Sequence, residues 1–187
     1  MVARAESAAA TAERILDAAE ALFAEAPARD ATLEQVAERA GVSVQTVIRR
    51  FGGREAVFAA ALERATTRVT ERRGAAPVGD LDAALGALVE HYEEHGDLVM
   101  RMLADEAGSE RVAGIVADGR RWHAEWCERI FASTLSHLRG GDRERRLAQL
   151  VALCDVYTWK LLRRDRGLGV GQTQLALREM LSPMVAA

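Results

Sequence analysis

The residues best suited to bind a charged partner lie between positions 39 and 54, where four arginines occur without an acidic residue. A guanidinium group can donate two parallel hydrogen bonds to guanine in the major groove or pair with a phosphate, and a glutamine amide matches adenine. The same stretch contains Gln45. This combination is typical of a surface that recognises DNA. The arginines are Arg39, Arg49, Arg50 and Arg54.

Two short helices separated by a tight turn are predicted to position these side chains. Thr32 caps the first helix, and Gln35 three residues later completes a capping box. The helix should stop at Ala40, because Gly41 takes a left-handed conformation without steric cost. This pattern predicts a helix-turn-helix.

The second helix is expected to turn its polar side outward. Ser43 caps it, and Val42 with Val47 forms a hydrophobic staple that fixes the entry of the chain. With Val47 and its apolar neighbours inward, a rotation of about 100° per residue places a cationic and amide-bearing face on the outside. The outward positions are Gln45, Thr46 and Arg49, with Ile48 and Arg50 at the edges.

A solvated helical hairpin that only carries surface charge is the alternative interpretation of this segment. Most runs of charge have no further role. Here, however, caps, turn, staple and charge asymmetry coincide in one window, and agreement across these levels favours a DNA-binding element.

The stretch from Thr11 to about Leu62 resembles the DNA-binding domain of the TetR (tetracycline repressor) family of transcriptional regulators. The resemblance rests on three segments in order: TAERILDAAEALFAE, TLEQVAERAGVSVQTVIRRF and GGREAVFAAAL. It implies an all-helical homodimer whose third helix enters the major groove, and a variable C-terminal domain that binds an effector. The residues expected to contact DNA are Thr32, Ser43, Gln45, Thr46, Arg49, Arg50 and Arg54.

Two positions depart from the pattern common in that family. Ile48 stands where a tyrosine is frequent, and it cannot donate a hydrogen bond to a phosphate. Arg54 stands where a lysine is frequent, and at the first turn of a helix its side chain can still meet a phosphate.

Composition is that of an ordinary globular protein, with 187 residues, 49% apolar and 28% charged. The net charge of -3 argues against a protein that coats nucleic acid without specificity, so DNA binding must come from a local patch. Cys127 and Cys154 lie in apolar helical patterns and are expected to be buried, reduced thiols rather than a disulfide. Neither a signal peptide nor a membrane span is apparent, so we expect a cytoplasmic protein that does not bind membranes.

The patterns predict an all-α chain of two domains. Residues 1–10 are expected to form a mobile arm, followed by helices over about 11–25 and 54–73, and a Gly- and Pro-containing linker marks the boundary. The arginines late in the second of these helices, Arg64, Arg68, Arg72 and Arg73, are interpreted as solvent-facing charges. The predicted domains are 1–73 for DNA binding, with a core over 11–65, and 80–187 for ligand binding and dimerisation.

The second domain should contain helices over about 80–95, 97–107, 109–138, 142–165 and 171–185, with a kink or split of the third near Asp118 and Gly119. The segment 142–165 is apolar on more than one side and must be covered twice. By the resemblance, the last two helices pair with their symmetry mates in a homodimer. Residues that line an effector pocket, unless they are plain core, are Tyr92, Met100, Leu103, Trp122, His123, Trp126 and Tyr157.

A possible metal motif is present at His91, Glu94 and His95, which match the zinc-protease pattern H-x-x-E-H. Against a metal site, Gly96 is expected to end the helix at once, and the remaining histidines, His123 and His137, lie far downstream. We therefore expect no cofactor, no metal and no catalytic residue.

The sequence thus predicts a TetR-like regulator that binds an operator in double-stranded DNA. The resemblance favours a repressor that a small, largely hydrophobic effector releases from a palindromic site. A helical metal-dependent hydrolase built on His91, Glu94 and His95 is the alternative.

Overall fold

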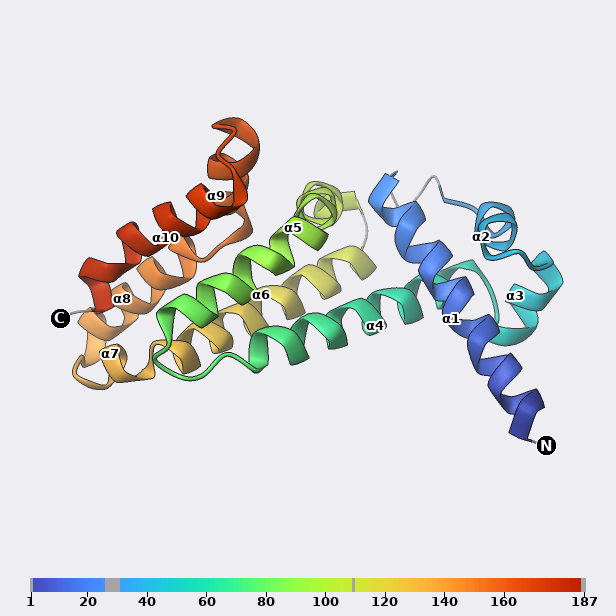
Figure 1. Cartoon of the computed structure of the whole chain (residues 1–187), viewed down its shortest axis with the longest axis horizontal. Coiled ribbons are helices and arrows are strands. Elements are labelled where there is room, and N and C mark those ends of the chain that lie inside the picture. Colours follow the sequence, from blue (N-terminus) through green and yellow to red (C-terminus); the bar gives the residue numbers. More distant parts are fainter. Residues whose placement is uncertain (1, 26–30, 109, 186–187) are drawn as a thin grey trace. The chain divides into compact units, whose positions relative to one another are not determined.

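The computed structural model describes residues 2–25, 31–108 and 110–185 of the chain (Figure 1). Within these ranges all regular elements are helices, which confirms the predicted all-α class. The chain divides into two compact units, Met1–Thr70 and Glu71–Ala187. The division falls inside helix α4 (Arg54–Gly74), a few residues before the linker at which the sequence placed it.

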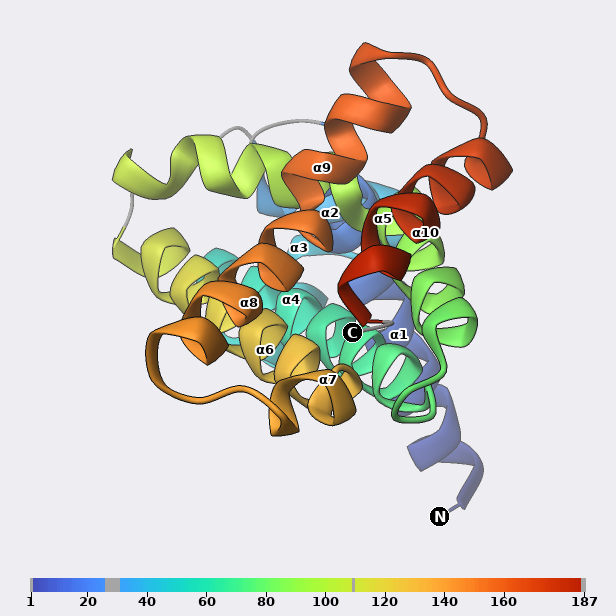
Figure 2. The same cartoon turned by 90° about the vertical axis from the view of Figure 1, so that its left-hand side faces the viewer.

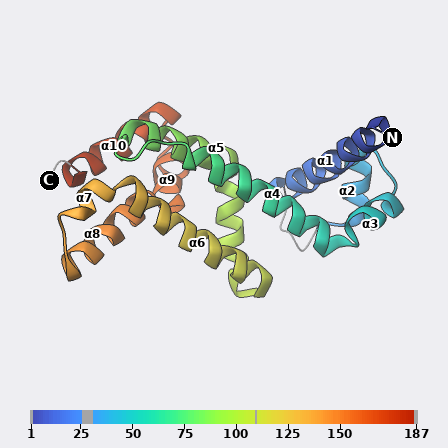
Figure 3. The same cartoon turned by 90° about the horizontal axis from the view of Figure 1, so that it is seen from below.

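The first unit consists of three helices and the greater part of α4 around one core. Helix α1 (Val2–Glu25) packs against α2 (Leu33–Ala40), which contacts α3 (Val44–Phe51) (Figure 1 and Figure 3). Two helices of eight residues are too short to be stable alone, so the longer helices must supply the surface that covers them. The shared core includes Ile15, Leu16, Ala19, Leu22, Val36, Ala37, Val47, Val57, Phe58 and Ala61.

Helix α1 begins nine residues earlier than predicted, at Val2 rather than Thr11. The expectation of a mobile arm is therefore wrong for residues 2–10. The reason is local, because the alanine-rich run has the highest helix propensity available. A tertiary contact adds to it: the guanidinium of Arg50 donates a hydrogen bond to the carbonyl oxygen of Ala8.

The second unit is built on four helices that contact one another in a closed circuit. Helix α5 contacts α6 and α10, and α8 contacts α6 and α10. Figure 2 shows the short helix α7 at the turn between α6 and α8. The elements are α5 (Leu81–Asp105), a 3₁₀ turn η1 (Glu106–Gly108), α6 (Glu110–Ile130), α7 (Ala132–Ser136), α8 (Gly140–Leu153), α9 (Val156–Lys160), a π-helical turn η2 (Leu161–Asp165) and α10 (Val170–Val185).

Helix α5 continues through Gly96, so the prediction that this glycine ends the helix is wrong. Gly96 is buried, and a methyl group at its Cα would lie 2.5 Å from Cζ3 of Trp159. The indole is itself fixed, because its Nε1 donates to Oε1 of Glu93 (2.9 Å). The glycine is therefore needed for the close approach of α9 to α5, and not for a turn.

Two other predicted helices are interrupted at unexpected places. Helix α6 passes Gly119 without a break and ends at Ile130, with Phe131 between it and α7. The predicted helix 142–165 is broken after Leu153, and Asp155 caps the next helix by accepting a hydrogen bond from the Tyr157 amide (2.9 Å). An Asp at a cap position competes with helix continuation, which explains the break.

The tight contact at Gly96 yields a stability prediction. Gly96→Ala should lower the free energy of unfolding by about 1–3 kcal/mol, because the added methyl overpacks against an immobile indole. Gly119→Ala, in open space on α6, should raise it by about 0.5–1 kcal/mol through helix propensity. Urea unfolding of both variants measures the effect, and a Gly96→Ala protein as stable as Gly119→Ala would contradict this packing.

Candidate nucleic-acid interface

Helix α2 is fixed by the capping box that the sequence predicts. The amide of Thr32 donates to Oε1 of Gln35 (2.8 Å), and the amide of Gln35 donates to the hydroxyl of Thr32 (3.3 Å). At the other end Gly41 is left-handed, with φ 65°, and the amide of Val42 donates to the carbonyl of Ala37 (3.0 Å). Both ends of α2 are thus closed by local hydrogen bonds, which sets the direction in which the chain enters α3.

Helix α3 begins with Ser43 as its cap. The Ser43 hydroxyl accepts from the amide of Thr46 (3.2 Å), and the two hydroxyls are 2.9 Å apart. Gly52 ends the helix in a left-handed conformation. The hydroxyls of Thr32 and Ser43 therefore act as helix caps, and that of Thr46 is bonded to the Ser43 hydroxyl. DNA contact by these three residues stays a prediction.

The inner and outer sides of α3 are as predicted. Val47 is fully buried, whereas Gln45, Arg49 and Arg50 are exposed. Ile48 is 38% exposed at the edge of this face. Because the buried valine fixes the rotation of this short helix about its axis, the side chains on the opposite face stay exposed.

The four arginines of the basic stretch differ in what they contact. Arg39 pairs with Glu25 through two hydrogen bonds of 2.8 Å, which lower the pKa of that carboxyl. Arg54 donates from Nε to the carbonyl of Ala31 (2.7 Å) and lies 5.3 Å from the ring centre of Phe58. Arg50 donates a hydrogen bond to the carbonyl oxygen of Ala8.

Arg49 differs from these three arginines, because its side chain has no hydrogen-bond or ion-pair partner among residues 2–25, 31–108 and 110–185. Its guanidinium is exposed on the same side of α3 as Gln45. The patch is thus smaller than four arginines suggest, and Arg49 with Gln45 forms its centre. The roles of these side chains on DNA stay predictions.

Arg64 joins α4 to α1 and is not the solvent-facing charge that the sequence suggested. It donates to Glu20 (2.9 Å) and Asp17 (2.7 Å) and also pairs with Glu13. Its side chain is largely buried, and the three carboxylates raise the pKa of the guanidinium. This cluster fixes α1 across the back of the helix-turn-helix.

In the second unit, four of the seven predicted ligand residues surround Arg73. The guanidinium carbon lies 4.0 Å from the ring centre of Trp126, 4.7 Å from that of Trp122 and 6.0 Å from that of Tyr92. Its Nη2 hydrogen-bonds Nδ1 of His123 (3.0 Å). Met100 and Leu103 pack at the edge of the core, and Tyr157 is half exposed.

The burial of Arg73 contradicts its interpretation as a solvent-facing charge. The residue is 2% exposed and is the largest charged side chain within the core. A signal for this was present in the sequence: Arg73 continues the four-residue spacing of Ala61, Ala65 and Val69 on the apolar side of the helix. Arginines nearby in the sequence hid that signal.

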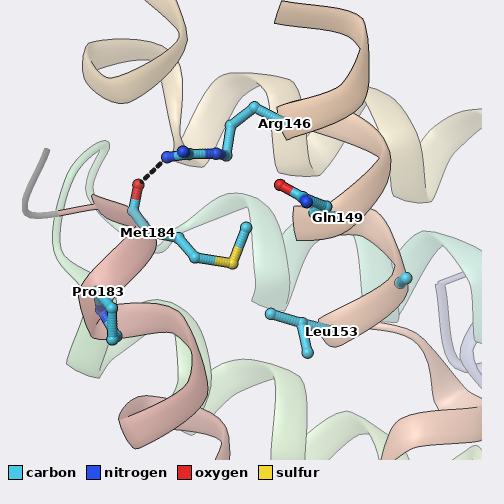
Figure 4. A pocket seen from close by; sticks show the side chains of 6 residues that line it. Arg146, Gln149, Leu153, Pro183 and Met184 are labelled. Carbon is cyan, nitrogen blue, oxygen red and sulfur yellow. Dashed lines mark hydrogen bonds between the residues drawn. The ribbon is translucent and has the colours of Figure 1, made fainter. Parts of the chain in front are cut away.

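A pocket of about 480 Å³ lies elsewhere in this unit, between α8 and α10 (Figure 4). Arg146 and Gln149 face Met184 across it, and Arg146 donates from Nη1 to the Met184 carbonyl (2.6 Å). None of the seven predicted ligand residues lines this pocket.

The H-x-x-E-H motif does not form a metal centre in the part of the chain that is described, where no group of three or more His, Cys, Asp or Glu side chains could hold an ion. His91 is buried with Nδ1 unpaired, and Nε2 of His95 lies 3.4 Å from Oε1 of Glu94. Burial and the positive charge of Arg73 lower the pKa of His91 to about 2. Such positive surroundings disfavour a divalent cation.

These helices form a helix-turn-helix whose basic and amide side chains face outward. This arrangement is typical of the helix-turn-helix class of DNA-binding proteins. Residues 15–61 match the family described as "Bacterial regulatory proteins, tetR family". This part of the chain thus resembles the DNA-binding domain of TetR-family transcriptional regulators. A comparison with curated protein sequences finds no significant match.

Solved structures of regulators share the fold over almost the whole chain. A TetR/AcrR-family regulator from Aquifex aeolicus is 21% identical with a TM-score of 0.66, covering 93% of this chain and 99% of that one. NalD, a repressor of a multidrug efflux pump in Pseudomonas aeruginosa, is 23% identical with a TM-score of 0.63 and 96% coverage of both chains. A regulator from Saccharomonospora viridis, in complex with choline, is 19% identical with a TM-score of 0.65, covering 91% and 95%.

None of the described helices has the length and apolar character that a membrane crossing requires.

The lowered pKa of His91 predicts acid sensitivity. Below pH about 6.5 the unfolded chain takes up a proton at His91 and the folded chain does not, so stability falls as pH drops. Between pH 7 and 4.5, His91→Gln should lose about 2 kcal/mol less than the wild type. Urea unfolding at both pH values measures this, with exposed His137→Gln as the control. Equal losses in all three proteins would show that His91 is accessible to protons.

Proposed function

We propose that this regulator is a dimeric repressor that acts in the cytoplasm and leaves its palindromic operator when a small effector binds. The observation that carries the proposal is the exposure of Gln45 and Arg49 on α3, opposite a valine that is fully buried. Arg49 can pair with guanine and Gln45 with adenine. Arg50 and Arg54 lie at the sides of this face and suit phosphates, which fix orientation without reading sequence.

A homodimer is supported by the distribution of exposed apolar side chains. The large hydrophobic residues that the structure exposes concentrate toward the end of the chain, in α9, η2 and α10. Apolar surface of this kind marks interfaces. Two recognition helices related by a twofold axis would read half-sites about 34–36 Å apart. The residues are Tyr157, Leu161, Val170, Leu175 and Met180.

An effector is supported by the second unit and by a relative. The regulator from Saccharomonospora viridis has choline bound, so a protein of this fold holds a small molecule. In this chain Tyr92, Trp122 and Trp126 provide aromatic surface for a ligand with a largely apolar body. Only Gly52 and Gly53 separate α3 from α4, and α4 continues as far as Arg73. One helix therefore links the proposed DNA-binding element to the proposed effector site.

Replacement of Arg49 tests the operator proposal. Arg49→Ala should weaken binding to the DNA upstream of the chain's own gene about 10- to 100-fold and leave binding to scrambled DNA nearly unchanged, because one bidentate base contact is lost. Arg50→Ala should weaken both DNAs to a similar degree. Fluorescence anisotropy measures both, with exposed Arg121→Ala of α6 as the control. Equal losses on the two DNAs for Arg49→Ala would refute a base contact.

A charge on α10 tests the dimer proposal. Leu175 is 44% exposed, and Leu175→Glu should weaken self-association at least about tenfold because a carboxylate would lose water at the interface. Val78 is 55% exposed in the linker, and Val78→Glu should leave association unchanged. Sedimentation over a concentration series measures both. A Leu175→Glu dimer as tight as the wild type would place the interface elsewhere.

A further inference from the structure

Arg73 is a buried cation without a carboxylate partner among the residues that the structure describes. Two other arginines that are largely buried do have one: Arg64 pairs with Glu20 (2.9 Å), and Arg163 pairs with Glu93 (2.9 Å). The charge of Arg73 is instead surrounded by rings and thiols, and burial lowers its pKa. A buried charge that lacks an opposite charge is costly to a fold, so its presence calls for a functional reason.

The contacts of Arg73 leave one N–H group of the guanidinium without an acceptor. The indoles of Trp122 and Trp126 lie over its faces at 4.7 and 4.0 Å, and Nη2 hydrogen-bonds His123. This bond requires a neutral His123 that accepts at Nδ1, with Nε2–H directed to the carbonyl of Val151 (3.3 Å). The Nε–H of Arg73 is buried without an acceptor. An Nε–H is one of the two donors with which a guanidinium binds a carboxylate through two parallel hydrogen bonds.

We propose that Arg73 binds the acidic group of the effector, and that this effector is a monocarboxylate with an apolar, aryl-sized body. The proposal rests on the proposed function, since it assigns a chemical class to that effector. The carboxylate would accept from the unpaired Nε–H of the guanidinium, and the body would lie against Tyr92, Trp122 and Trp126. Of these three, Trp122 is the half-buried one and offers the way in.

The surroundings favour a monocarboxylate over other ligands. A phosphate dianion would have to lose more water than one guanidinium and aromatic walls can replace. A cation such as choline would meet a ring of aromatic faces already occupied by Arg73, with a second nitrogen-bearing side chain, His91, nearby. An apolar molecule without charge would leave the cation unpaired.

The position of Arg73 explains how such an acid would be sensed. Arg73 lies in the last turn of α4, and its carbonyl oxygen accepts from Nε1 of Trp126 (3.0 Å) and from Arg129 (3.4 Å). Pairing its side chain with an anion changes the contacts of that same tryptophan. The end of α4 would thereby respond to the ligand, and α4 begins directly after the recognition helix.

The experiment measures thermal stability and tryptophan fluorescence of the full chain with benzoate, phenylacetate and indole-3-acetate, each compared with its primary amide, and with inorganic phosphate and choline. At least one acid should raise the melting temperature and change the emission, whereas the amides, phosphate and choline should not. Arg73→Met should reduce affinity for that acid at least about tenfold. Arg72→Met is the matched control, because Arg72 is exposed and pairs with Glu94 (2.7 Å).

Arg73→Met should also be at least as stable as the wild type without ligand, since it removes an unpaired buried charge. If that variant does not fold, the comparison of each acid with its amide on the wild-type protein still tests the proposal. No response to any acid, equal responses to acid and amide, or an unchanged response in Arg73→Met would overturn the proposal. Operator binding measured in parallel separates the two ideas: a protein that binds its operator but ignores these acids refutes the carboxylate alone.

Discussion

The burial of Val47 is the interaction on which the orientation of α3 depends. Helix α3 has eight residues, and its outward side chains point where they do only because the opposite side is locked into the core of the first unit. That core is itself shared between α1 and α4, which the ion pairs of Arg64 tie together. The polar face is therefore a consequence of apolar packing behind it, and the caps at Thr32 and Ser43 only set the entry angles.

The second unit follows a different physical logic. Its helices are joined by close contacts such as Gly96 against Trp159, yet its core contains a cation and two histidines that a stable fold does not need. Stability alone would favour an apolar residue at position 73. Dense aromatic packing is thus combined with an unsatisfied Nε–H of Arg73 and an unpaired His91 nitrogen, which a core selected for stability alone would avoid.

Local signals determined how much could be predicted. The ends of α2 and α3 follow from Thr32, Gly41 and Ser43, because caps and left-handed glycines act within a few residues, and the outward face of α3 follows from helical periodicity. Two of the features that failed, Gly96 and Arg73, depend on long-range contacts. Gly96 is a helix breaker in isolation and a packing position only when Trp159, 63 positions later in the numbering, comes to rest on it.

Arg73 shows the same limit in the candidate site. Four of the aromatic and histidine residues around it were expected to line a pocket, but the side chain at their centre was not, because charge predicts exposure more strongly than a four-residue spacing predicts burial. The break at Asp155 was closer to being predictable, since aspartate is a common cap. The sequence on both sides of Asp155 is so apolar that its helical periodicity favoured one continuous helix over a break at this residue.

Both cysteines of the chain, Cys127 and Cys154, are buried in the core of the second unit, while the first unit contains no thiol. A reagent that reacts with sulfur can therefore reach its target only during a transient opening of that half, and the DNA-binding half is silent to it. The rate of modification therefore measures how often the core of the second unit opens in the intact, unlabelled protein.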